Sequence, residues 1–185
     1  MKVIGLCGKL GAGKDTLADY LVRKHEFVKI TMSDIIKKEM ESEGIEDIDR
    51  HKLQEFSGKM KEKYGADIWA KACITYARKN HFRRVVISGI RDSAELKFFR
   101  TLGDDFKLIC VKADQETRFK RIKYRDSEKD RNISTFADFI KMEVDESKKF
   151  DLYNCCDVAD FVINNNTILI GLYSATEAVL KKLVW

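Results

Sequence analysis

The chain has 185 residues, of which 44% are hydrophobic and 35% charged, with a net charge of +5. This length predicts a single domain with a proper core, and this composition is typical of a soluble globular protein. Basic and acidic residues alternate along the chain, which favours small anionic ligands over nucleic acid as the partner. Without an apolar run of roughly 18 residues or an N-terminal leader, we expect a cytoplasmic protein that has no membrane partner.

Short apolar runs and amphipathic segments alternate along the chain. The expected strands span residues 3–7, 27–31, 85–88, 106–112 and 161–164. The expected helices span residues 16–24, 35–43, 50–64, 94–102, 115–125, 136–150 and 168–183, and a further helix begins at residue 67 and includes residue 76. This order predicts right-handed βαβ crossovers, and therefore an α/β fold with a five-stranded parallel sheet that has helices on both faces.

A glycine-rich segment after the first expected strand carries the strongest functional signal. Its glycines let consecutive backbone N–H groups converge on phosphate oxygens, and the helix that follows adds the positive end of its dipole. A lysine at the start of that helix supplies a mobile charge for the β- and γ-phosphates. We therefore predict a phosphate-binding loop of the P-loop NTPase type. The residues expected to contact ATP are Gly8, Gly11, Ala12, Gly13, Lys14, Asp15 and Thr16.

Asp15 occupies the position after the lysine, where most phosphate-binding loops have Ser or Thr, and Thr16 follows it. Adenylate-kinase-like enzymes also have the hydroxyl residue one position later, two residues after the lysine. The Gly-Lys-Asp-Thr sequence is similar to that of deoxynucleoside monophosphate kinases. The resemblance implies a small-molecule kinase that uses ATP as phosphate donor and Mg²⁺ as cofactor. Ser88 stands where those kinases have a strand-end acidic residue, so we expect ATP to hold most of the Mg²⁺ shell, with Asp15 or Asp34 acting through water.

The resemblance extends over nearly the whole chain and covers the archaeal adenylate-kinase-related proteins, with deoxynucleotide and dephospho-coenzyme A kinases as near relations. Nucleoside monophosphate kinases line the acceptor phosphate with an Asp-Gly-x-(Pro)-Arg element, which residues 88–91 resemble. The planar guanidinium of an arginine can hold two phosphate oxygens at once. The resemblance implies that residues 33–80 form an acceptor-binding arm. The implied acceptor-binding residues are Asp34, Lys37, Lys61 and Arg91.

Arg118, Arg121 and Arg125 are three and four residues apart, so a helix places them on one face, where phosphate would relieve their repulsion. In the adenylate-kinase superfamily an Arg-x-x-x-Arg pair stands at the base of a lid, and Arg121 and Arg125 match it. The resemblance implies a lid region at residues 126–150. It also divides the single domain, with residues 1–32, 81–125 and 151–185 as the core. The implied catalytic residues are Lys14, Arg91, Arg121 and Arg125, and Arg121 and Asn165 are implied to contact ATP near its base.

The phosphate-binding loop predicts a nucleotide site, and the resemblance implies a monomeric or homodimeric phosphotransferase that moves the γ-phosphate of Mg-ATP to a nucleoside or deoxynucleoside monophosphate. Three alternatives remain open. The chain could be a dephospho-coenzyme A kinase-like enzyme, or a regulatory ATPase with no small-molecule acceptor, which the Ser88 position slightly favours. A nucleic-acid-binding module is the third alternative.

The five cysteines follow no metal-ligand spacing and the three histidines are scattered, so we expect no zinc site. Cys7 and Cys110 lie in expected strands, where a thiol behaves as a small hydrophobe. The neighbouring Cys155 and Cys156 are expected to be two packed thiols in a reducing compartment, with a redox device as the alternative.

Overall fold

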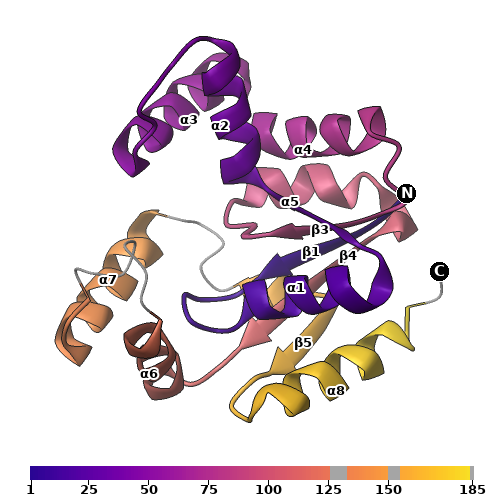
Figure 1. Ribbon diagram of the computed structural model, residues 1–185, viewed down its shortest axis with the longest axis vertical. Helices are drawn as coiled ribbons and strands as arrows, with labels where there is room; N and C mark the ends of the chain where they lie inside the picture. Colours follow the sequence, from indigo (N-terminus) through magenta and orange to yellow (C-terminus); the bar gives the residue numbers. More distant parts are fainter. Residues whose placement is uncertain (126–132, 150–154, 184–185) are drawn as a thin grey trace.

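The computed structural model describes residues 1–125, 133–149 and 155–183. Its strands form one parallel sheet in the order β2-β3-β1-β4-β5 (Figure 1), which confirms the predicted sheet. The carboxyl ends of all strands therefore meet at one edge. The strands are β1 (Lys2–Cys7), β2 (Val28–Thr31), β3 (Arg84–Ser88), β4 (Phe106–Lys112) and β5 (Phe161–Asn164).

Helices cover both faces of the sheet, as predicted, with α4 and α5 on one face and α1 and α8 on the other (Figure 1). None of the helices in the described ranges combines the length and the apolar character that a membrane crossing requires. The helices are α1 (Lys14–His25), α2 (Met32–Ser42), α3 (Arg50–Tyr64), α4 (Ile68–Lys79), α5 (Ser93–Arg100), α6 (Gln115–Tyr124), α7 (Phe136–Lys149) and α8 (Leu169–Leu180), with short 3-10 turns η1 (Gly103–Asp105) and η3 (Cys155–Val158).

The central strand β1 is a continuous apolar run because the sheet buries it on both faces. Val3 and Cys7 contribute to the core beneath α4 and α5, whereas Ile4 and Leu6 contribute to the core beneath α1 and α8. In the parallel register, Cys7 lies directly across from Cys110 of β4. This alternation sets the two faces of the sheet and places the end of β1 in the middle of the sheet edge.

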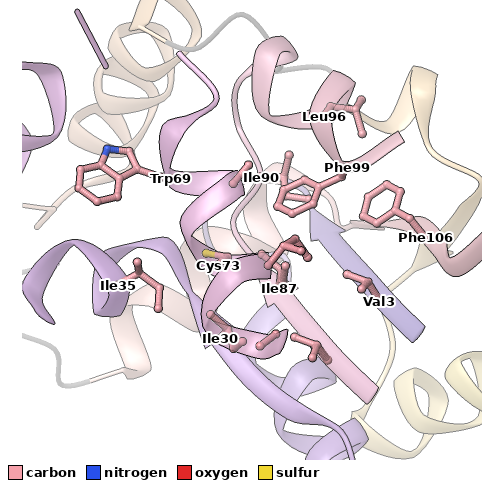
Figure 2. Packing of buried hydrophobic residues seen from close by; sticks show 14 of the residues in the cluster. Val3, Ile30, Ile35, Trp69, Cys73, Ile87, Ile90, Leu96, Phe99 and Phe106 are labelled. Atoms are coloured by element: carbon pink, nitrogen blue, oxygen red, sulfur yellow. The ribbon is translucent and has the colours of Figure 1, made fainter. Parts of the chain in front are cut away.

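Helices α2, α3 and α4 occupy the chain between β2 and β3, in the range expected for the arm. Helix α2 begins directly after β2, because the Thr31 hydroxyl caps it by accepting the N–H of Asp34 at 3.1 Å. Helix α4 buries Trp69 and Cys73 in the main core, so this helix covers the sheet instead of standing apart from it (Figure 2). The assignment of the arm to acceptor binding remains a prediction.

The described part of the expected lid region consists mainly of α7, while residues 126–132 and 150 lie outside the described residues. Phe139 of α7 is fully buried and packs in a small cluster with Ile122 of α6 and Ile133. Leu10 of the loop after β1 also packs against this cluster. Helix α7, which lies within the expected lid region, is therefore anchored on α6 and on the glycine-rich loop.

The cysteines differ from the sequence-based expectation. Cys156 forms a disulfide with Cys110, 46 residues away, whereas its neighbour Cys155 is a buried free thiol. The two adjacent cysteines are therefore not a pair of packed thiols. The cause is the packing of η3 against β4, which brings Cys156 to the strand that carries Cys110.

Substitution of Phe99 in α5 tests the packing of the core beneath α4 and α5. This side chain is fully buried and stacks on Phe106 with ring centroids 5.4 Å apart (Figure 2). We expect Phe99→Ala to lower the free energy of unfolding by about 3–5 kcal/mol, through lost burial and a cavity. Urea denaturation would measure this loss. The control is Phe98→Ala, whose half-buried ring should cost less; equal losses for both variants would contradict the described packing.

Candidate functional site

The loop between β1 and α1 lies so close to its neighbours that Gly8, Gly11 and Gly13 leave no room for a Cβ. Gly8 has a φ of 133°, and a Cβ there would lie 2.2 Å from the carbonyl oxygen of Val111. Gly13 has a φ of 105°, and a Cβ there would lie 2.3 Å from Nδ2 of Asn165. Both values of φ lie in the region that side chains with a Cβ rarely adopt. The loop also contains Gly11, with a φ of 77°, and the buried Ala12.

Lys14 begins α1 and its side chain folds back over the loop. Its ammonium donates to the carbonyl oxygens of Gly8 at 2.7 Å and Lys9 at 3.0 Å. Burial lowers the pKa of Lys14 to about 8, and the positive charge of Arg91 acts in the same direction. Because the positive charges of Lys14 and Arg91 repel each other, a bound anion would stabilise the charged form of Lys14. Thr16 lies half-buried in the same helical turn.

Arg91 follows β3 and reaches the same region from the neighbouring strand. Its Nη1 lies 3.6 Å from Oε1 of Glu146, which belongs to α7. The same carboxylate also acts on the charge of Lys14. The structure thus brings Lys14 and Arg91 together and adds Glu146, which sequence reasoning missed, since a glutamate on an amphipathic helix carries no distinctive signal.

Asp15 lies beside the end of β3, where the Ser88 hydroxyl donates to its Oδ1 at 3.4 Å. Lys29 of β2 pairs with the same oxygen at 3.3 Å. Burial opposes ionisation of Asp15, but the charges of Lys29 and Lys14 and the hydrogen bonds from Lys29 and Ser88 together outweigh it and lower the pKa of Asp15. Carboxylate and hydroxyl oxygens are the hard ligands that Mg²⁺ prefers, so this corner fits Mg²⁺ chemically. Asp34 is exposed in the first turn of α2.

The two lysines expected to bind the acceptor lie in acidic surroundings. The Lys61 ammonium pairs with Asp92 at 3.1 Å and with Glu95 at 2.9 Å. Burial raises the pKa of Glu95, while Lys61 acts against that rise. Lys37 is exposed and lines a shallow hollow together with Glu41. Because two carboxylates already compensate the charge of Lys61, an acceptor phosphate would have to compete with them.

Arg118 is only 3% exposed and is not a cation available on a shared face with Arg121 and Arg125. Its guanidinium forms an ion pair with Glu143 of α7, stacks over a ring of the α6–α7 cluster, and donates to the carbonyl oxygen of Leu10 at 3.2 Å. The expectation of three uncompensated arginines was therefore wrong for Arg118. Its role in the structure is to hold α6, α7 and the tip of the loop together.

Arg121 and Asn165, which the resemblance assigns to ATP binding, lie in contact with each other next to the loop. Nη2 of Arg121 donates to the carbonyl oxygen of Thr167 at 3.2 Å and to Oδ1 of Asn165 at 3.5 Å. Its Nη1 is buried without a hydrogen-bond partner in the described part of the chain. Asn165 is 4% exposed and donates to the carbonyl oxygen of Ala12 at 2.8 Å. Arg125 is exposed at the point where α6 ends.

Comparisons of the sequence with known proteins identify related families. A family model described as an AAA domain matches residues 4–148. The UPF0200 protein Ta0179 of Thermoplasma acidophilum is 30% identical over 178 residues, which cover 96% of this chain and 94% of that protein. A UPF0200/UPF0201 protein of Archaeoglobus fulgidus is 32% identical over 187 residues, and the match covers 99% of this chain but only 56% of that relative.

Solved structures with the same fold include kinases. Shikimate kinase from Bacteroides thetaiotaomicron superposes with a TM-score of 0.62 at 17% identity, covering 100% of this chain and 99% of that one. Shikimate kinase from Aquifex aeolicus has a TM-score of 0.51 at 17% identity, with 97% and 96% covered. At these identities the similarity establishes the P-loop kinase-like fold and not a substrate.

The buried ion pair between Arg118 and Glu143 generates a stability prediction. Glu143→Gln leaves the charge of Arg118 buried without its counter-ion, so we expect the free energy of unfolding to fall by about 3–5 kcal/mol. Thermal and urea unfolding would measure the change. The control is Asp145→Asn on the exposed side of the same helix, which should change stability little. If Glu143→Gln behaved like this control, the ion pair would not be the anchor of α7.

Proposed function

The chain belongs to the AAA domain family and to the UPF0200 proteins, and from this premise we propose that it is an ATP-dependent phosphotransferase acting on a nucleoside or deoxynucleoside monophosphate. The observation that carries the proposal is that the two cations Lys14 and Arg91 lie close together. They reach one region from the segments that follow β1 and β3, and the charge of Arg91 helps to lower the pKa of Lys14. Two cations, one at the start of α1 and one in the segment after β3, match a reaction that brings two phosphate groups together.

Phosphoryl transfer requires alignment of donor and acceptor, neutralisation of charge and exclusion of water, with little covalent help from the protein. In the proposed mechanism the backbone of residues 8–13 and the Lys14 ammonium hold the β- and γ-phosphates of ATP. Arg121 and Asn165 bind the side of the nucleotide that lies against the turn after β5. Arg121 and Arg125 close over the transferring group. Mg²⁺ bound near Asp15 and Ser88, through water, would neutralise phosphate charge.

Arg91 is the proposed ligand of the acceptor phosphate. Its guanidinium is now paired with Glu146, so the acceptor phosphate would replace a carboxylate of α7 as its partner. Asp34 and Lys37 remain proposed acceptor contacts from α2. Lys61 is the weakest member of the proposed set, because its charge is compensated by Asp92 and Glu95.

A regulatory ATPase without a small-molecule acceptor is the second candidate function. It is favoured by the hydroxyl of Ser88 at a strand end where related kinases have a carboxylate, and by the compensated charge of Lys61. The two candidates differ in one observable. A kinase releases one ADP for each acceptor molecule that it phosphorylates, whereas such an ATPase releases ADP at a rate that does not depend on the acceptor.

The decisive experiment measures ADP release from ATP and Mg²⁺ by a coupled assay. The acceptors to be screened are the ribo- and deoxynucleoside monophosphates, dephospho-coenzyme A and, given the kinases that share the fold, shikimate. We expect one nucleoside monophosphate to stimulate ADP release strongly and to appear as the diphosphate. Stimulation by dephospho-coenzyme A or shikimate would show that the acceptor is not a nucleoside monophosphate. A rate of ADP release that no acceptor changes would support the ATPase.

Substitutions of the two cations should separate donor binding from acceptor binding. Arg91→Ala is expected to raise the acceptor KM while leaving ATP binding nearly unchanged, because Arg91 contacts only the acceptor in the proposed mechanism. Lys14→Ala is expected to lower kcat by roughly a hundredfold or more, as for other lost donors to transition-state charge. Steady-state kinetics with both substrates varied would measure this. Unchanged acceptor kinetics in Arg91→Ala would refute the acceptor site.

The lowered pKa of Lys14 predicts how ATP affinity depends on pH. Below about pH 8 the free protein already carries the charged ammonium. Above it Lys14 is neutral, and ATP must bind together with a proton, because phosphate raises the pKa of a neighbouring cation. We therefore expect affinity to fall above pH 8 by up to about tenfold per pH unit, with proton uptake visible by calorimetry in buffers of different ionisation enthalpy.

The control for this pH dependence is Lys14→Met, which retains most of the side-chain length without a titrating group. This variant should bind ATP more weakly, and its affinity should no longer change near pH 8. A change that persisted in Lys14→Met would assign the titration to another group of the site.

A further inference from the structure

Four of the five cysteines gather where β1 and β4 end, next to the glycine-rich loop. The sulfur atoms of Cys7, Cys110 and Cys155 all lie within 4.8 Å of one another. Cys156 is bonded to Cys110 through the disulfide. We call these four residues the sulfur cluster. The fifth cysteine, Cys73, lies in α4 and is not a member of this cluster.

The sulfur cluster is built by the fold from three separate segments. The parallel register of β1 and β4 places Cys7 directly across from Cys110. The short turn η3, which packs against β4, adds the buried Cys155 and the half-buried Cys156. A disulfide that served only to tie η3 to β4 would need two cysteines. Here two further thiols lie close enough to exchange with it.

One of these thiols is placed to act as a nucleophile. The Cys7 thiol forms a hydrogen bond with Cys155 that lowers the pKa of Cys155 against the effect of burial. The ammonium of Lys14 and a backbone hydrogen bond at Gly8 act in the same direction. The pKa of Cys7 is raised by the same hydrogen bond and by burial, so Cys7 is the thiol that stays protonated. The attacking species in thiol–disulfide exchange is the thiolate.

We propose that the sulfur cluster is a thiol–disulfide exchange site, whose substrate is an external dithiol or disulfide and whose state is coupled to the phosphate-binding loop. In the internal step, the thiolate of Cys155 attacks Sγ of Cys110. A Cys110–Cys155 bond forms, the Cys110–Cys156 bond breaks, and the electron pair leaves on Sγ of Cys156. One disulfide and one thiolate are present before and after, so the step needs no oxidant.

Exchange with the outside proceeds through Cys156, the half-buried member. An external dithiol attacks its sulfur, expels the thiolate of Cys110, and then closes to its own disulfide. Two electrons and two protons pass from the dithiol to Cys110 and Cys156. An external disulfide reverses this reaction. The coupling follows from position, because Cys7 directly precedes Gly8, and Gly8 accepts the hydrogen bond of the Lys14 ammonium at 2.7 Å.

Trapping of the disulfides tests the exchange without any assay of phosphotransfer. The full chain is equilibrated in glutathione redox buffers, quenched by alkylation and mapped by peptide mass spectrometry. In Cys156→Ser we expect Cys110 to form a bond with Cys155 under the oxidising conditions that preserve the wild-type disulfide. In Cys155→Ser we expect only the Cys110–Cys156 bond. Cys73→Ala, outside the sulfur cluster, should give the wild-type pattern.

Free Cys110 and Cys155 thiols in oxidised Cys156→Ser would overturn the exchange site. The wild-type chain provides a second measurement that does not depend on how the variants fold, because rapid alkylation should trap a fraction with the Cys110–Cys155 bond. A reduced chain that bound one equivalent of added Zn²⁺ and thereby protected its sulfurs from alkylation would also overturn the proposal, in favour of a metal site.

The coupling rests on the proposed ATP binding and has its own readout. We expect ATP to bind about fivefold more tightly to the oxidised chain than to the reduced one, because the disulfide holds η3 and Cys155 in place beside Gly8. Calorimetry on both forms would measure this difference, and equal affinities would overturn the coupling. The disulfide map is independent of ATP, so failure of the exchange site and failure of the proposed kinase activity are distinguishable.

Discussion

The turn that follows β1 is the constraint on which the rest of the site depends. The chain leaves the central strand β1 through a tight turn at Gly8. Any residue other than glycine at this position would place its Cβ 2.2 Å from the carbonyl oxygen of Val111. The resulting loop is held from three sides. Asn165 binds the carbonyl of Ala12, Arg118 binds the carbonyl of Leu10, and Lys14 closes over the start of the turn.

The distribution of carboxylates separates the cations around this loop into two groups. Arg91, Lys61 and Arg118 each face a carboxylate, so their charges are already balanced within the fold. Lys14 and Arg121 are instead held by neutral oxygen atoms. Neutral oxygens orient a cation without cancelling its charge, which leaves these two side chains suited to attract phosphate. Arg91 can join them only if a ligand takes the place of Glu146.

The same edge of the sheet also carries the sulfur cluster, and this proximity is a consequence of topology. Parallel strands bring all their carboxyl ends together, so the residue that ends β1 lies across from Cys110 and directly before the phosphate-binding loop. In the proposed coupling, a change in the bonding of η3 would act on Gly8 through Cys155, which forms hydrogen bonds with Cys7 and with the backbone at Gly8. In an antiparallel sheet the ends of neighbouring strands would lie at opposite edges, and the sulfur cluster would not adjoin the loop.

The sequence by itself determined the order of strands and helices, the parallel sheet and the glycine-rich loop with Lys14, because these depend on periodicity and on local backbone requirements that neighbouring residues express. Only the tertiary structure decided which cations are compensated and which sulfurs meet. Glu143 neutralises Arg118 across 25 residues and Cys110 bonds to Cys156 across 46. These partners are brought together by the packing of α7 against α6 and of η3 against β4. Residues so far apart in the sequence leave no local pattern from which their contact could be predicted.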